Sequence, residues 1–189
     1  ERERLDEARE NLAKISELTE RMAGIANHLK TFARRPSKKI GRIDLNKAVE
    51  NALDLLDRRI RDEEVSVSLD FPGTGLFVKG GEIRLEQVFV NLIGNALDAM
   101  REVSTKELRI RADLEEDMTA IAIQDTGTGL SDEELALIFD PFYTSKEVGK
   151  GLGLGLSISY NIVRDFGGSI KATSNPGEGT TFTIRLEGA

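Results

Sequence analysis

The sequence has no cysteine and only one histidine among its 189 residues. Without cysteine, neither a disulfide nor a thiolate metal site can form, which fits a reducing compartment. A single histidine excludes a zinc site of the usual three- or four-ligand kind. Long apolar runs are also lacking: no stretch of about 18 apolar residues could span a membrane, and the charged N-terminus is not a signal peptide. We therefore expect a soluble segment, such as an excised piece of a longer protein.

An excess of basic charge is absent as well. The formal net charge is -7, so the chain lacks the basic surface that binding to nucleic acid usually requires. Hydrophobic residues make up 39% of the chain and charged residues 31%, which indicates a folded globular protein and not a disordered one. The length suffices for one domain with an appendage, or for two small domains.

The first 35 residues have the pattern of one long helix. Their apolar residues recur every three or four positions and form a narrow stripe on a charged surface. Such a stripe requires a partner helix, from the same chain or from a second copy. Pro36 ends the pattern, and a short linker follows. We divide the chain into this helix with its linker, residues 1–38, and a globular domain, residues 39–189, and expect a homodimer through the helix.

The globular domain mixes helices and strands. Helices are predicted at about 45–60, with Asp44 as the N-cap, and at 82–100, 131–138 and 155–166. Strands are predicted at about 65–69, 76–78, 108–114, 119–125, 169–174 and 180–186. Helices and strands do not alternate strictly, as they would in a parallel doubly wound sheet. The sequence therefore predicts the α+β class: a two-layer α/β sandwich with helices on one face of an antiparallel or mixed sheet.

The predicted helix 82–100 contains the first candidate site. Asn91, Asn95 and Asp98 are four and three positions apart, so their side chains share one polar face. An amide oxygen can bind a hard cation such as Mg²⁺, which also keeps waters and phosphate oxygens. The alternative is a solvated helix face without a ligand. The core side of this helix is expected to consist of Ile83, Leu85, Val88, Leu92, Ile93, Ala96 and Leu97.

A second candidate directly follows the predicted strand 119–125. Asp125 at the strand end can accept a hydrogen bond from an exocyclic amine such as that of adenine. Gly127 and Gly129 allow a tight turn and a close approach to a flat ligand. The alternative is an ordinary turn, which the same residues also suit.

A third candidate is the glycine-dense run that leads into the predicted helix 155–166. Glycines alternate at positions 149, 151, 153 and 155. Free backbone N–H groups and the positive end of a helix suit phosphate. The run is neither a P-loop nor a Gly-x-Gly-x-x-Gly motif. In a helix these glycines would cost about 1 kcal/mol each relative to alanine, so a purely structural role explains them poorly.

The segment between the second and third candidates reads as a lid. It contains Lys146 and Lys150 next to the glycine run, where they could approach phosphate. Its aromatic residues, Phe139, Phe142 and Tyr143, are expected to pack. A last glycine-containing pattern at residues 177–182 enters the final strand and could be only a turn.

In order and spacing these segments resemble the sequence boxes of the sensor histidine kinases. The matching segments are Asn91 to Asp98, Asp125 to Gly129, Phe139 to Phe142, Gly151 to Leu156 and Gly179 to Thr181. The resemblance covers roughly residues 40–187 and implies the Bergerat-type ATP-binding fold, within the superfamily shared by gyrase, Hsp90 and MutL. The run from Phe139 to Tyr160 is most similar to the C4-dicarboxylate-sensing kinases, which regulate transport genes through a response regulator.

The resemblance implies ATP and Mg²⁺ as cofactors and gives roles to the matching residues. Asn95 would bind Mg²⁺, Asn91 would support the triphosphate, and Asp98 lies beside them. Asp125 would bind the adenine amine, and Lys146 would reach the terminal phosphate. The remaining residues implied to contact the nucleotide are Gly127, Gly129 and Thr181 near adenine, and Gly151, Leu152, Gly153, Leu154 and Gly155 on the phosphate side.

The residue at position 91 favours a kinase over an ATPase. ATPases of this superfamily have a glutamate one helical turn before the magnesium-binding asparagine, and Asn91 stands there. An amide cannot take a proton from water, whereas a carboxylate can. The implied function is donation of the ATP γ-phosphate to a histidine, for relay to the receiver domain of a response regulator. Two alternatives are a nucleotide-binding and dimerisation module that is catalytically silent, and an ATPase of the same superfamily.

The only histidine, His28, is not expected to be the phosphoacceptor. The family's acceptor box has an acidic residue directly after the histidine and a proline several residues later, whereas Leu29 and Phe32 stand here. Residues 22–34 instead resemble the second helix of the family's dimerisation hairpin. We expect the acceptor upstream of this chain. The resemblance also implies that the chain is the cytoplasmic portion of an inner-membrane sensor.

Overall fold

The computed structural model describes residues 11, 19, 40–73, 75–146 and 152–189. Of the predicted N-terminal helix, only Asn11 and Thr19 are described, and both are helical and exposed. The remainder of that helix, with His28, lies outside the described residues, so the predicted domain boundary at residue 38 stays a prediction.

The described helices confirm the helical pattern of the sequence. They are α2 (Leu45–Asp62), α3 (Glu82–Ala99), α4 (Asp132–Leu137) and α5 (Gly155–Asp165). Asp44 caps α2, because its carboxylate accepts a hydrogen bond from the backbone N–H of Lys47 at 3.2 Å. Ser131 and Glu134 form a capping box at the start of α4.

Five strands form a mixed sheet, as predicted. The strands of the described residues are β1 (Gly41–Asp44), β2 (Ser66–Asp70), β3 (Phe77–Gly80), β4 (Glu107–Glu115), β5 (Met118–Asp125), β6 (Ser169–Asn175) and β7 (Gly179–Glu187). The sheet has the order β2-β4-β5-β7-β6, in which β2 and β4 are parallel and the other neighbours antiparallel. β1 and β3 pair as a separate antiparallel ribbon.

Strand β1 was not predicted from the sequence. It occupies residues that read as a linker and the start of a helix cap, and its partner β3 is more than 30 positions further along. The guanidinium of Arg42 lies 3.6 Å from the ring centre of Phe77, a cation–π contact across the ribbon. Only this pairing makes the segment a strand.

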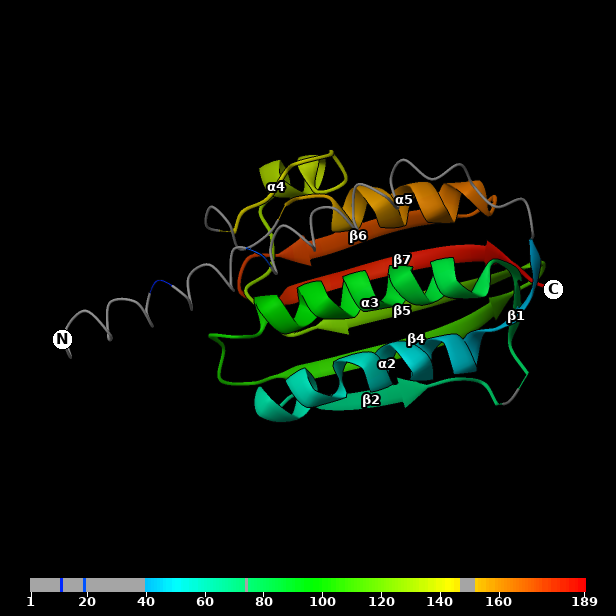
Figure 1. The fold of residues 1–189 in the computed structure, drawn as a ribbon, viewed down its shortest axis with the longest axis horizontal. Helices are drawn as coiled ribbons and strands as arrows, with labels where there is room; N and C mark the ends of the chain where they lie inside the picture. The colour runs from blue at the N-terminus through cyan, green and yellow to red at the C-terminus, as the bar shows by residue number, and fades with distance from the viewer. Residues whose placement is uncertain (1–10, 12–18, 20–39, 74, 147–151) are drawn as a thin grey trace.

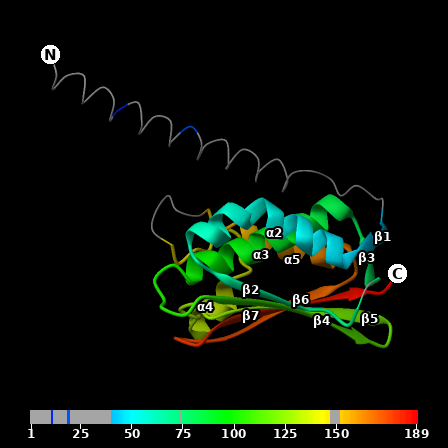
Figure 2. The ribbon, with the colours of Figure 1, turned by 90° about the horizontal axis from the view of Figure 1, so that it is seen from below.

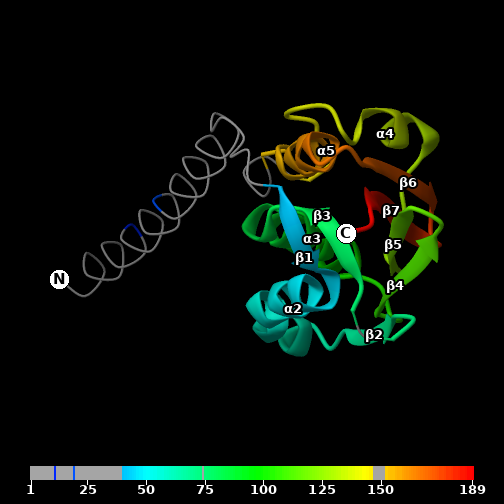
Figure 3. The ribbon, with the colours of Figure 1, turned by 90° about the vertical axis from the view of Figure 1, so that its right-hand side faces the viewer.

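Three helices cover one face of the sheet, which gives the predicted two layers. Figure 2 shows α2, α3 and α5 together on one side of the five strands. In Figure 3, α3 lies between α2, at the β2 side of the sheet, and α5, at the β6 side. No helix in the described ranges is long and apolar enough to cross a membrane.

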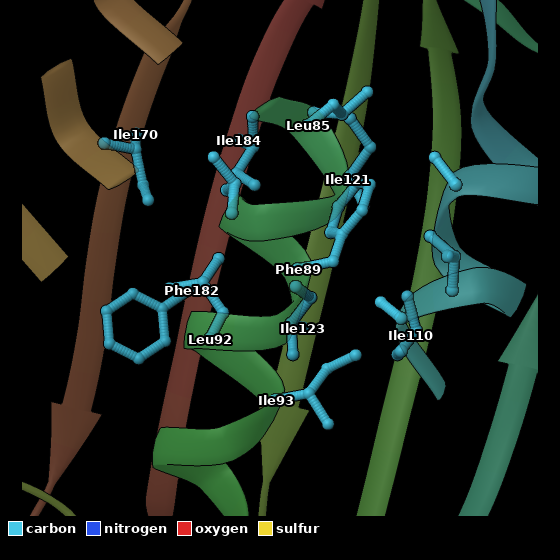
Figure 4. Packing of buried hydrophobic residues seen from close by; sticks show 14 of the residues in the cluster. Leu85, Phe89, Leu92, Ile93, Ile110, Ile121, Ile123, Ile170, Phe182 and Ile184 are labelled. Carbon is cyan, nitrogen blue, oxygen red and sulfur yellow. The ribbon is translucent and has the colours of Figure 1, made fainter. Parts of the chain in front are cut away.

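The core lies between α3 and the central strands. Figure 4 shows residues of α3 such as Phe89 and Leu92 packed over Ile121, Ile123 and Ile184 of β5 and β7. Phe89 is completely buried, although it was missing from the predicted core side. Ile83 was wrongly included there and is 80% exposed. It precedes Leu85 by two residues, and about 100° of rotation per residue places it on the opposite side of the helix.

The candidate segments meet at one end of the sandwich. The end of β5, the β6–β7 turn, the last turn of α3, the start of α5 and α4 all lie at the left of Figure 1. The end of α3 at Ala99 and the start of β7 at Gly179 are 80 positions apart in sequence, and the fold brings them together.

Candidate functional site

Asp125 is a buried acid at the end of β5 with one carboxylate oxygen held in place. It is 3% exposed, and its Oδ1 accepts hydrogen bonds from the backbone N–H groups of Gly127 at 2.8 Å and Thr180 at 3.2 Å. Burial raises the pKa of Asp125, and the two hydrogen bonds offset only part of this rise. Within the described ranges no hydrogen bond reaches Oδ2. That oxygen can therefore accept a hydrogen bond from a ligand.

The two glycines after Asp125 are required by packing within the protein. A Cβ on Gly127 would lie 2.7 Å from the Cβ of Ala99 at the end of α3. Gly129 has a φ of +69°, and its Cβ would lie 2.0 Å from the carbonyl oxygen of Asn175. The turn at residues 126–129 thus packs tightly between the end of α3 and the β6–β7 turn. Whether either glycine also borders a ligand stays a prediction.

The threonine beside Asp125 is Thr180, which the sequence analysis did not single out, and a nucleotide contact of Thr181 stays a prediction. Side chains alternate along β7, and Phe182 faces the core with Ile123 as its partner on β5. Thr180 lies on that same face and is buried, whereas Thr181 pairs with the exposed Gln124 on the opposite face. The two-residue period from Phe182 could have shown this in the sequence.

Asn91 joins α3 to the first turn of α5. Its amide nitrogen donates hydrogen bonds to the backbone carbonyl of Gly155 at 3.1 Å and to the hydroxyl of Ser159 at 3.3 Å. The side chain therefore lies at the start of α5, where backbone N–H groups without helical partners point outward. A group at this position can orient a ligand at the helix end, and the triphosphate role of Asn91 stays a prediction.

Asn95, Asp98 and Lys146 form one polar cluster. The ammonium of Lys146 lies 3.3 Å from Oδ1 of Asn95 and 2.5 Å from Oδ2 of Asp98. The side chains of Lys146 and Asp98 are 34% and 26% exposed, so the ion pair is partly shielded from water. The predicted polar face of α3 therefore has a partner and is not simply solvated.

Asp98 is held from its other side by two arginines. Its Oδ1 accepts hydrogen bonds from Arg59 of α2 at 2.9 Å and from Arg101 at 3.2 Å. Burial by itself would raise the pKa of Asp98, but Lys146 and Arg59 together lower it below its ordinary value. Arg59 could not be recognised as a partner of Asp98 from the sequence, because the two residues are 39 positions apart.

The described part of the glycine run contacts the lid segment. Gly153 has a φ of +65°, and its Cβ would lie 2.3 Å from the carbonyl oxygen of Tyr143. The carbonyl of Gly153 accepts a hydrogen bond from the N–H of Phe142 at 2.9 Å. Gly155 begins α5 beneath Asn91. Lys150 and Gly151 lie outside the described residues.

The two leucines of the run pack against the core, and their predicted contacts with a nucleotide stay a prediction. Leu154 is buried in the core, so its side chain is not available to a nucleotide and only its backbone could be. Leu152 is partly buried against the same core. Of the lid aromatics, Phe139 packs as predicted against Tyr160 and Phe182, with ring centres 5.5 and 6.5 Å apart, whereas Phe142 is 69% exposed.

The residues present fit Mg²⁺ only when a ligand supplies further oxygens. In the part of the chain that the structure describes, no group of three or more His, Asp or Glu side chains could hold a metal ion. Asn95 and Asp98 offer two adjacent oxygen donors. Mg²⁺ in nucleotide sites commonly takes one or two protein ligands and completes its six positions with phosphate and water. The donor set thus fits a metal that arrives with a phosphate compound.

A surface hollow lies at the opposite end of the sheet from these residues. It has a volume of about 700 Å³ and is lined by residues such as Leu76, Leu114 and Thr119. None of the residues predicted to bind nucleotide lines it.

Comparison with known proteins identifies the family. The profile described as "Histidine kinase-, DNA gyrase B-, and HSP90-like ATPase" matches residues 80–189. The C4-dicarboxylate transport sensor protein DctB of Rhizobium meliloti (strain 1021) is 41% identical over 182 residues, which are 96% of this chain and 29% of that protein. The chain thus spans less than a third of this relative.

Solved structures show the same fold. The catalytic domain of histidine kinase ThkA has a TM-score of 0.70 and 27% identity, covering 79% of this chain and 95% of that one. ThkA in complex with the response regulator protein TrrA also has a TM-score of 0.70, at 23% identity over 94% of this chain and 49% of that one. The chain therefore belongs to the histidine kinase-, DNA gyrase B- and HSP90-like ATPase family, as an ATP-binding catalytic domain of the histidine kinase type.

Proposed function

We propose that the chain binds ATP with Mg²⁺ and donates the γ-phosphate to a histidine on a dimerisation hairpin. The observation that carries this proposal is the buried Asp125: two backbone N–H groups fix one carboxylate oxygen, and no hydrogen bond from the described residues reaches the other. A fixed acceptor in a buried position selects a ligand with a matching donor, such as the adenine amine. Thr180 lies beside it.

The phosphate end of the nucleotide would lie toward α3 and α5. Asn95 and Asp98 would hold Mg²⁺, which neutralises phosphate charge when bound. Asn91 and the first N–H groups of α5 would orient the phosphates, with Lys146 as a second positive charge. Gly151, which is not among the described residues, would complete the phosphate side.

The contacts of Asn91 favour transfer over hydrolysis. Its amide donates to Gly155 and Ser159, and it has no carboxylate that could deprotonate water. The γ-phosphate would therefore be transferred to a better nucleophile, the imidazole of a histidine, instead of to water. That arrangement is expected of a kinase.

The partners follow from this role. The phosphorylated histidine would pass its phosphate to the receiver domain of a response regulator, and the kinase would act as a homodimer through residues 1–38. The similarity to DctB suggests a signalling system for C4-dicarboxylates. Because ATP is the phosphate donor, the chain would be the cytoplasmic portion of an inner-membrane sensor.

Phosphotransfer in trans tests the proposal. The chain is incubated with γ-labelled ATP, Mg²⁺ and a separate hairpin that carries the acceptor histidine of the DctB relative. We expect acid-labile, base-stable label on the hairpin, and its loss in Asn95→Ala. The control Asn161→Ala, at an exposed position of α5, should keep the activity. Rapid hydrolysis without labelling would favour the ATPase, and binding with neither would favour the silent module.

A further inference from the structure

The ammonium of Lys146 occupies the polar face of α3 that would bind the metal. Its Nζ contacts Oδ1 of Asn95 and Oδ2 of Asp98, the two oxygens that a hard cation would use. The chain therefore places a cation of its own on both donors. This lysine comes from the segment between α4 and α5, 48 positions after Asp98.

The acceptor side of this contact is fixed. Arg59 reaches Asp98 from α2, and Arg101 reaches it from the end of α3, both at Oδ1. These bonds leave Oδ2 aimed at Lys146. The lysine has a flexible four-carbon stem and three donors that can rotate to new partners. The side chain of Lys146 can thus move to a new partner, whereas the carboxylate of Asp98 is held in place by the two arginines.

Lys146 and a divalent cation exclude each other from this position. Two positive charges a few ångströms apart repel, and both need the same oxygens of Asn95 and Asp98. A metal that arrives alone must displace the ammonium and gives it no new acceptor. A metal that arrives on a nucleotide brings phosphate oxygens, with which the displaced ammonium can form charge-assisted hydrogen bonds.

We propose that Lys146 is a specificity residue that closes the metal position to free divalent cations and opens it to the metal–nucleotide complex. This inference rests on the proposed function, because it takes Asn95 and Asp98 as the metal donors. Lys146 would thus ensure that the metal binds together with the nucleotide and not before it. Removal of the ammonium should therefore strengthen binding of the metal alone and weaken the dependence of metal binding on nucleotide.

The test is binding of Mn²⁺ alone, without nucleotide, measured from the electron paramagnetic resonance signal of the free ion. In Lys146→Met the dissociation constant for Mn²⁺ should fall about fivefold or more, the lower end of the usual range for coupled sites. Lys171→Met, which removes an exposed lysine of β6, should match the unmodified chain. In Lys146→Met combined with Asn95→Ala the gain should disappear. Equal dissociation constants for Lys146→Met and the unmodified chain would overturn the proposal.

An ATP titration of the same samples separates this inference from the proposed function. The unmodified chain could bind ATP more tightly with Mg²⁺ than without it while Lys146→Met leaves the dissociation constant for Mn²⁺ unchanged. This result overturns the role of Lys146 and leaves the proposed function standing. No ATP binding by the unmodified chain overturns the proposed function. A gain in Mn²⁺ affinity that survives Asn95→Ala also overturns the inference, because the metal then binds elsewhere. Circular dichroism shows whether each variant is folded.

Discussion

The carboxylate of Asp125 and the backbone of Thr180 are hydrogen-bonded across the sheet, with 3.2 Å between Oδ1 and the amide nitrogen. The two residues are 55 positions apart, at the end of β5 and the start of β7. The contact fixes the direction of the carboxylate before any ligand arrives, so little ordering remains to be done on binding. The direction of this carboxylate is therefore set by a contact between strands as well as by the turn at Gly127.

The buried charge of Asp125 should lower the stability of the protein as pH rises. Because its pKa is raised in the folded state, the folded protein holds this proton more tightly than the unfolded chain does. The stabilisation is complete below the unfolded pKa, near 3.8, and is lost as pH rises through the raised folded value. Asp125→Asn has no such charge. Its free energy of unfolding should therefore rise relative to that of the unmodified chain as pH increases over this range.

Urea unfolding at a series of pH values from acidic to neutral measures this difference. Asp70→Asn, at an exposed position of β2, serves as the control and should show no comparable gain. A difference between Asp125→Asn and the unmodified chain that stays constant or shrinks with rising pH would contradict the raised pKa.

Asn91→Ala should weaken the joint between α3 and α5. The change removes two hydrogen bonds, while the carbonyl of Gly155 still accepts one from Ser159 at 3.0 Å. The expected cost is about 1 kcal/mol relative to Asn161→Ala, an exposed asparagine of α5 that gains the same helix propensity on substitution. Thermal and chemical unfolding of the two variants provide the measurement. Equal free energies of unfolding would show that the contacts of Asn91 contribute nothing.

Gly129→Ala should destabilise the protein by more than about 2 kcal/mol, because a left-handed backbone and a backbone clash act together. The added Cβ would lie 2.0 Å from the carbonyl of Asn175. Gly94→Ala is the matched control: Gly94 is helical with open space around it, so alanine should stabilise it by up to about 1 kcal/mol. Unfolding midpoints in urea compare the two. A mild effect at Gly129 would show that the turn can move away from Asn175 at the end of β6.

Local sequence rules were enough for every described helix and for the described strands other than β1, and they placed the candidate residues on those elements. Asp44 and Ser131 are caps whose bonds join residues three positions apart, and the polar face at Asn95 follows from helical spacing. The position of Asp125 at a strand end follows from the strand pattern. Each of these features depends on neighbours within one turn or one strand, which a sequence shows directly.

Contacts between distant segments could not be predicted. Strand β1 exists only through its pairing with β3, and Arg59 reaches Asp98 only because α2 packs on α3. The contact of Lys146 with Asn95 likewise depends on how the segment after α4 folds back. The position of Thr180 on the same face as Phe182, by contrast, follows from the alternation of side chains along β7.

The most direct test of nucleotide binding is a calorimetric titration with ATP, with and without Mg²⁺. We expect binding that Mg²⁺ strengthens in the unmodified chain. Asp125→Asn should weaken binding about tenfold or more in both conditions, since its amide places a donor against the adenine amine; a factor of ten corresponds to about 1.4 kcal/mol. Asn95→Ala should remove mainly the Mg²⁺-dependent part. Unchanged affinity in Asp125→Asn, or no heat of binding from the unmodified chain, would contradict ATP recognition at the end of β5.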